Sequence, residues 1–201
     1  MTTTERTPRR LAVLIPALLL SYGVLRLIDG LDGDHGPGLA WNLGHVFFLA
    51  AFALLGAFVV TLRRMVPETT PRGRAAANTA MAAGLAGAAC FIWVIIGDLS
   101  PALADAAPLP EPLQLAGPLA FQIGLIALLT MLATARPRKL PVWSPILTFV
   151  SFALITANLD LLPLAALTLL AAFAPLAATA NSLPHQAVWT PTPTPTANNS
   201  R

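Results

Sequence analysis

The sequence predicts an all-α protein, a polytopic membrane bundle of six transmembrane helices. Three observations lead to this fold class. Hydrophobic residues make up 56% of the 201 residues and charged residues only 10%, whereas about 25% of the residues of a soluble domain are charged. The apolar residues form runs of about 20, the length of helix that crosses a bilayer. Basic and acidic residues occur in separate groups that alternate along the chain, a pattern typical of loops on opposite sides of a membrane.

Six spans follow from the lengths of these runs. The first four are residues 11–28, 40–62, 77–97 and 115–134. A last apolar stretch begins near residue 142 and ends near residue 179, and as one helix it would measure roughly 55 Å, nearly twice the hydrocarbon thickness. We therefore expect two spans, 142–158 and 161–179, joined by a tight hairpin. Asn158 is expected to end the first of these helices, and Asp160 to cap the second.

The basic residues predict the orientation of the bundle. Eleven of the twelve fall into four groups. These are Arg6/Arg9/Arg10, Arg63/Arg64/Arg72/Arg74, Arg136/Arg138/Lys139 and Arg201. Cytoplasmic loops carry an excess of Lys and Arg, so both termini and the basic loops are expected in the cytoplasm. Arg26 is the one basic residue that this scheme leaves on the outer side. The preference for Arg over Lys, eleven to one, favours a bacterial plasma membrane.

Three segments make up the expected domain organisation. Residues 1–10 form a cytoplasmic N-terminal tail, residues 11–180 a single transmembrane domain, and residues 181–201 a disordered cytoplasmic tail rich in Pro and Thr. Most prolines near the spans, Pro118, Pro145 and Pro163, are expected in first helical turns, where the missing amide hydrogen is not needed.

Span 77–97 is the candidate for the central helix. Small residues recur every four positions at Ala76, Ala80, Gly84 and Ala88, and such a repeat lets another backbone approach closely. The alternative is that alanine is simply frequent in this chain.

Polar residues gather in the outer half of the predicted membrane region. An ionisable group at the centre of a membrane helix costs at least about 2.5–3.5 kcal/mol unless it is paired or hydrated, so their common depth indicates a shallow polar cavity open to the exterior. The candidate solute-binding residues are Arg26, His45, Asp98, Gln122, Asn158 and Asp160.

A purely structural explanation remains open for several of them. The carboxylates lie near helix ends, where water can reach them, and Asp160 has a capping role available. Arg26 can reach the membrane surface or pair with Asp29, three residues further along the helix. His45 can serve only as a hydrogen-bonding group between helices.

Motifs of several enzyme classes are missing from the sequence. It contains no Gly-x-Ser-x-Gly, no His-Glu-x-x-His, no phosphate-binding loop and no second cysteine beside Cys90. We therefore expect no cofactor and no metal. Whether the chain is an enzyme stays open, and the missing motifs weigh against it. The expected partners are the lipid bilayer and other membrane subunits, not nucleic acid.

Two functions stay open. The first is binding or translocation of a small polar or ionic solute through the outer-half cavity. The second is a non-catalytic accessory, assembly or sensory role through helix–helix contacts. An enzyme with an unrecognised intramembrane site ranks last, because neither a nucleophile–base pair nor a set of metal ligands is visible.

Overall fold

The computed structural model describes residues 3–33, 35–67 and 70–178, and all the regular structure in these ranges is helical. The elements are α1 (Thr3–Asp29), η1 (Gly30–Asp32), α2 (Leu39–Met65), α3 (Pro71–Leu99), α4 (Pro101–Ala106), α5 (Glu111–Thr134), α6 (Trp143–Ala157), η2 (Leu159–Leu161) and α7 (Leu162–Ala178). Within the described ranges, five helical stretches are long and apolar enough to cross a membrane. They lie in α1, α2, α3, α5 and η2–α7. The all-α fold class is confirmed, and a sixth span would have to be the shorter α6.

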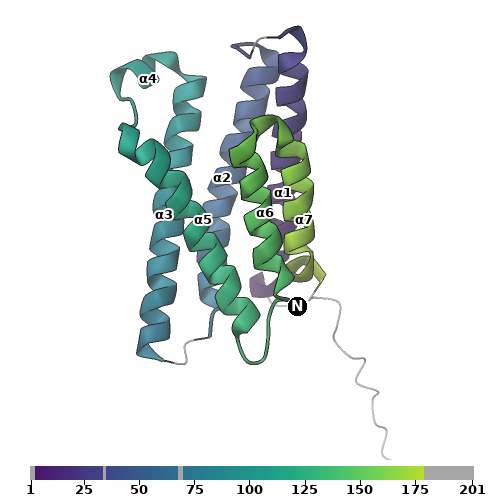
Figure 1. Cartoon of the computed structure of the whole chain (residues 1–201), viewed down its shortest axis with the longest axis vertical. Coiled ribbons are helices and arrows are strands. Elements are labelled where there is room, and N and C mark those ends of the chain that lie inside the picture. The colour runs from purple at the N-terminus through teal and green to yellow at the C-terminus, as the bar shows by residue number, and fades with distance from the viewer. Residues whose placement is uncertain (1–2, 34, 68–69, 179–201) are drawn as a thin grey trace, which may run out of the picture.

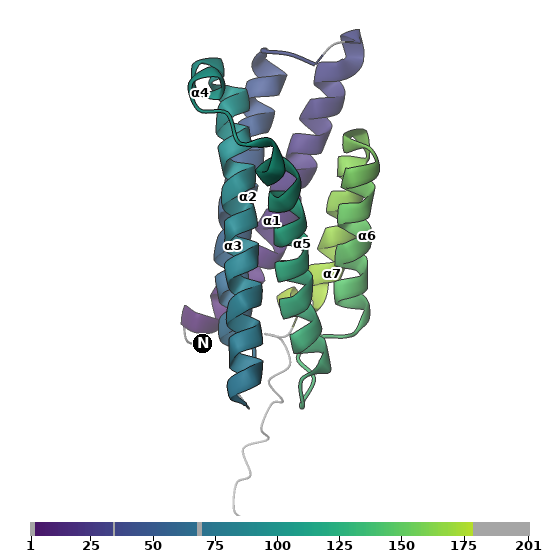
Figure 2. The ribbon, with the colours of Figure 1, turned by 60° about the vertical axis from the view of Figure 1, so that its left-hand side comes forward.

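The long helices run antiparallel and pack in a closed order (Figure 1). α1 packs between α2 and α7, α3 between α2 and α5, and α6 between α5 and α7. The start of α1 and the α2–α3 and α5–α6 connections lie at the lower end of Figure 1, whereas the α1–α2 connection and α4 lie at the upper end. Turning the molecule gives the same order of helices (Figure 2).

Aromatic rings fill the middle of the bundle. Phe52 of α2 contacts Phe91 of α3, with ring centroids 4.1 Å apart, and also Phe121 of α5. Phe121 in turn meets Phe152 of α6 edge to face, at 5.6 Å. Edge-to-face and tilted pairs are the favoured geometries of aromatic rings, and this cluster joins four helices below the candidate site.

Glycines set the close approach of α3 and α5. A Cβ atom on Gly87 would overlap the backbone at Gly117 and Phe121, and one on Gly124 would overlap the backbone at Ala80 and Gly84. The prediction that small residues of this span admit a neighbouring backbone is confirmed at Ala80 and Gly84. The expected central position is wrong, because α3 lies at one edge of the bundle, where it packs against α2, α5 and the short α4.

The predicted hairpin between α6 and α7 is confirmed. Asn158 is its cap, because its side-chain oxygen accepts a hydrogen bond from the backbone N–H of Asp160 at 2.8 Å. The predicted capping role of Asp160 is therefore wrong. Two buried hydroxyls then hold the helices together: Ser144 donates to the carbonyl of Ala172 at 2.7 Å, and Ser151 to that of Ala165 at 2.8 Å.

The hairpin is shorter than its neighbours. In both views its tip ends well below the α1–α2 connection (Figures 1 and 2). It meets α1 near Gly23, where an added Cβ would lie 2.9 Å from the ring of Pro163. This contact places the residues around Asp160 beside the last turns of α1, and it is the part of the fold that matters most for the candidate site.

Three predicted helix starts differ from the structure by four residues or more. α3 begins at Pro71 rather than at residue 77. α5 begins at Glu111 rather than at residue 115, so Pro118 lies inside the helix and not in its first turn. α1 begins at Thr3, within the segment expected to be a tail. Pro145 and Pro163 do lie in first turns. The expected C-terminal tail, residues 181–201, lies outside the described residues.

Candidate functional site

Three of the predicted residues, each from a different helix, line one cavity. Arg26 comes from the last turn of α1, His45 from the second turn of α2 and Asp98 from the end of α3. The cavity has a volume of about 290 Å³. Its remaining walls are mostly aromatic and aliphatic, and the aromatic members are Tyr22, Trp41, Phe48, Phe52, Phe91 and Phe152. We refer to this space as the polar cavity.

His45 is the most buried of these polar side chains, with 4% of its surface exposed. Its Nδ1 lies 2.9 Å from the carbonyl oxygen of Trp41, one turn earlier on α2. Its Nε2 lies 3.5 Å from Oδ2 of Asp98 on α3. The ring also packs against Trp41, at 4.1 Å between centroids, and edge-on against Tyr22, at 5.4 Å. Both nitrogens and both neighbouring rings therefore fix the orientation of the imidazole.

Arg26 pairs with the hairpin and not with its neighbour on α1. Its Nε lies 3.3 Å from Oδ1 of Asp160 in η2. Asp29, which the sequence offered as one alternative for Arg26, contacts His35 at 3.5 Å and accepts a hydrogen bond from the backbone N–H of Gly36 at 3.3 Å. The alternative of a local pair on α1 is therefore not formed, because the α1–α2 connection folds back onto Asp29 and the hairpin brings a second carboxylate to Arg26.

The charges are concentrated at one end of the cavity. The side chain of Arg26 is 17% exposed, whereas those of Asp98 and Asp160 are nearly half exposed. Asp98 is also held in register with α2, because the indole Nε1 of Trp41 donates to its backbone carbonyl at 3.5 Å. The carboxylates of Asp98 and Asp160 thus reach solvent, and each faces a more buried partner, His45 or Arg26. This arrangement can orient the charged group of a small molecule and leave the aromatic walls to its apolar part.

The remaining predicted residues have other positions. Asp160 touches the site through Arg26, although it does not line the polar cavity. Asn158 serves as the cap of η2, which positions Asp160. Gln122 is half-buried on α5 and is not among the lining residues. The depth of Gln122 along α5 therefore does not by itself bring its side chain to this cavity.

Sequence reasoning missed Tyr22 and Trp41 as members of the site. Tyr22 precedes Arg26 by four residues, and Trp41 precedes His45 by four. Residues four apart lie on the same face of a helix, so this spacing could have placed both rings beside the charged groups. Tyr22 is the only tyrosine in the chain, and it lines the polar cavity together with Arg26.

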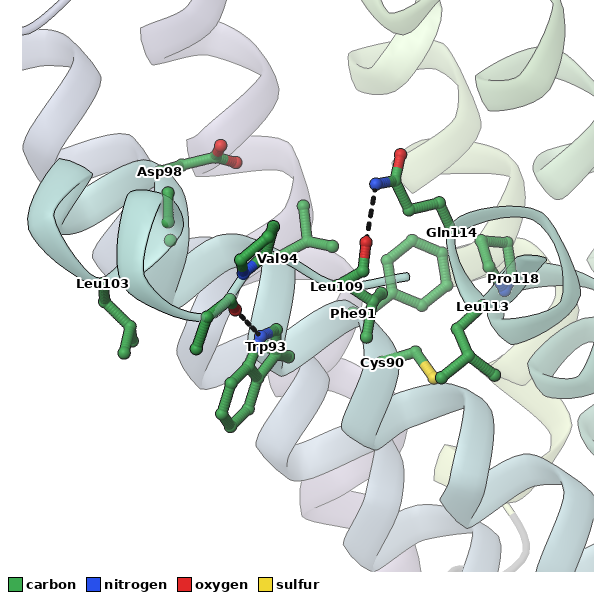
Figure 3. Close-up of a pocket in the computed structure, with 14 residues that line it drawn as sticks. Cys90, Phe91, Trp93, Val94, Asp98, Leu103, Leu109, Leu113, Gln114 and Pro118 are labelled. Atoms are coloured by element: carbon green, nitrogen blue, oxygen red, sulfur yellow. Dashed lines mark hydrogen bonds between the residues drawn. The ribbon is translucent and has the colours of Figure 1, made fainter. Parts of the chain in front are cut away.

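A second cavity, of about 400 Å³, lies on the other side of α3, between α3, α4 and α5 (Figure 3). Its two longest polar side chains are occupied with the loop before α5. Trp93 donates to the carbonyl of Ala107 at 3.0 Å, and Gln114 donates to that of Leu109 at 2.8 Å. Cys90 is half-buried there, beside Gly117. The polar contacts of this cavity therefore fasten the α4–α5 connection.

The two cavities share one wall of α3. Phe91, Val94 and Asp98 line both of them. Figure 3 shows Asp98 at one end of the second cavity, with its carboxylate pointing away from Trp93, and Cys90 at the other end. Asp98 thus belongs mainly to the group with His45.

Across the described residues, no group of three or more His, Cys, Asp or Glu side chains is arranged to hold a metal ion. The polar groups at the polar cavity are the Arg26–Asp160 ion pair and the contact between His45 and Asp98, set among aromatic rings. No protein-family model, curated protein or solved structure matches this chain.

Proposed function

We propose that this chain is a six-span protein of a bacterial plasma membrane that binds or translocates a small polar or ionic solute through the polar cavity. The observation that carries the proposal is the convergence of Arg26, His45 and Asp98, from three helices, on one space of about 290 Å³. This volume is close to the lower end of the range for small-molecule sites, about 300 Å³. Ionisable groups at membrane depth also usually face a bundle interior or a wet cavity.

The distribution of charge along the bundle supports cytoplasmic termini. The start of α1 and the α2–α3 and α5–α6 connections, which carry the basic groups, all lie at one end of the bundle. An excess of Arg and Lys marks the cytoplasmic side. The polar cavity lies toward the opposite end, where α1 ends and α2 begins, and it would therefore open to the exterior.

The length of α6 can be reconciled with a sixth span. Its 15 residues measure about 22 Å, less than the hydrocarbon thickness of about 30 Å. α6 packs between α5 and α7, and the tip of the hairpin meets α1. A short span ending at Arg26 and Asp160 would leave the outer part of the bundle open to water beside the polar cavity.

The chemistry of the walls points to an ion with an apolar body. Arg26 donates through Nε to Asp160, which leaves the four Nη hydrogens of the guanidinium for other acceptors. Aromatic rings line the deeper part of the cavity. Benzoate combines a carboxylate with a ring and is a suitable first probe, whereas inorganic phosphate tests for the anion alone and choline tests for a cation held by aromatic rings.

The test measures the thermal stability of the intact protein in detergent micelles with each of the three probes. We expect benzoate to raise the melting temperature of the wild type, because a ligand that binds only the folded state stabilises it. The double variant Arg26→Ala/His45→Ala should lose this response. The control Arg64→Ala/His35→Ala removes the same two residue types from exposed positions outside the cavity and should keep it.

Equal responses of the wild type and the cavity variant, to all three probes, would remove the solute-binding proposal. The charge pairs would then serve only to join helices. The accessory role through helix–helix contacts would be the better explanation, because Arg26 and Asp160 join α1 to η2, and His45 and Asp98 join α2 to α3.

A further inference from the structure

The two nitrogens of His45 face different kinds of acceptor. Nδ1 lies 2.9 Å from the carbonyl oxygen of Trp41. A carbonyl oxygen can only accept a hydrogen bond, so Nδ1 carries a hydrogen. This assignment fixes the tautomer: in the neutral imidazole, Nε2 is the unprotonated nitrogen.

Nε2 then faces a carboxylate. It lies 3.5 Å from Oδ2 of Asp98. With no further proton, two atoms that only accept hydrogen bonds would face one another in a place where His45 is almost entirely buried. One added proton removes the conflict, whether it resides on Nε2 or on the carboxyl group. The pair is therefore built to hold a single proton.

A route for this proton exists on one side only. The imidazole is covered by Tyr22 and Trp41, whereas the side chain of Asp98 is 43% exposed. Exchange with water would thus proceed through the carboxyl group of Asp98, which faces both the solvent and His45.

The surrounding charges link this proton to an anion in the polar cavity. Around His45, α1 contributes Tyr22 and the cation Arg26, α3 contributes Asp98, and η2 contributes Asp160 through its pair with Arg26. Without the extra proton, the ionised groups Arg26, Asp98 and Asp160 sum to one negative charge, and with it they sum to zero. An incoming anion is repelled less in the second state.

We propose that His45 and Asp98 form a proton-binding site, and that an anionic solute and a proton bind to the polar cavity together. The second half of this statement rests on the proposed function, and the first does not. Because linkage is reciprocal, a proton that favours the anion must itself be favoured by the anion to the same extent.

The first experiment reports on the proton site alone. The full-length protein is labelled with ¹⁵N-histidine in detergent micelles, and the three histidines are resolved by NMR, with His45→Gln identifying the signals of His45. We expect Nδ1 of His45 to carry hydrogen throughout the titration and Nε2 to gain a hydrogen on acidification. An Nε2-protonated neutral tautomer would overturn the proton site, whether or not any solute binds.

The second experiment reports on the linkage. Calorimetric titration with benzoate, in buffers of different ionisation enthalpy, counts the protons taken up on binding. We expect an uptake of up to about one proton per site, and the affinity should fall as the pH rises, by up to about tenfold per pH unit.

Two carboxylate variants separate the pair from a general charge effect. Asp98→Asn keeps the shape of the side chain and should abolish the proton uptake. Asp105→Asn, at an exposed position on α4 outside both cavities, should retain it. Benzoate binding without proton uptake in the wild type would overturn the linkage. If benzoate does not bind while Nε2 titrates as expected, the proposed function fails and the proton site stands.

Discussion

Arg26 and Asp160 are 134 residues apart in the chain, and their side chains meet at 3.3 Å. The pair joins the last turn of α1 to the 3₁₀ turn at the tip of the α6–α7 hairpin. The pair therefore connects η2, between α6 and α7, to α1 beside the polar cavity. Neither residue belongs to the basic groups that predict the orientation of the chain.

We expect this pair to contribute little to global stability. Asp160 is 47% exposed, and exposed ion pairs contribute about 0.2–1 kcal/mol. A double-mutant cycle of Arg26→Ala and Asp160→Ala, measured by unfolding in mixed micelles, should give a coupling energy within that range. A coupling of zero would show that the pair does not hold the hairpin.

The crossing of α3 and α5 should be far more sensitive. Gly87→Ala places a methyl group against the backbone of Gly117 and Phe121, and overpacking of this kind costs about 1–3 kcal/mol. We expect a clear drop in the melting temperature. Gly56→Ala is the matched control within a helix, because its Cβ would meet only the end of Leu85, at 3.8 Å, and it should be neutral or slightly stabilising. Equal effects of the two variants would contradict the close crossing.

Local signals made part of this structure predictable. The hairpin could be placed from the sequence because Asn158 and Pro163 act on the backbone next to them. Small residues at Ala80 and Gly84 predicted a close crossing, although Gly87 was not among them. The role of Gly87 depends on the backbone of α5 that packs against it. A repeat of small residues on α3 does not show where another helix will pack.

The sequence predicted the level in the membrane at which the site residues lie, but not the side of each helix on which they lie. Arg26, His45 and Asp98 were grouped because they lie at the same level of the membrane, and they do share a cavity. Gln122 was grouped with them for the same reason, and it does not line the cavity. The partner of Arg26 depends on how far the α6–α7 hairpin reaches along α1, which is a property of the packed bundle and of no single segment.

The buried hydroxyls between α6 and α7 give a third prediction. Ser151→Ala removes the hydrogen bond to the carbonyl of Ala165 with almost no change of volume. Bonds of this kind between membrane helices contribute about 0.6 kcal/mol on average and at most about 1.7, so a loss within that range is expected in micelle unfolding. Thr168→Ala, whose hydroxyl bonds to Leu164 of its own helix, should be close to neutral. A larger loss in the control would contradict the assignment.

The six-span topology predicts the behaviour of three fusions to a fluorescent protein that becomes fluorescent only in the cytoplasm. Fusion after Arg138 and fusion after Arg201 should both fluoresce, because these basic segments are expected on the cytoplasmic side. A chain ended at Asn158, after α6, should be dark. The signal of each fusion in intact cells is divided by its amount in the membrane fraction, so that poor expression is not mistaken for an external position.

A dark fusion at Arg201 would mean five spans, with α6 not crossing, since α7 alone would then carry the C-terminus outside. A bright fusion at Asn158 would contradict the spanning of α6 directly, and the short length of that helix, about 22 Å, makes this fusion the most informative of the three.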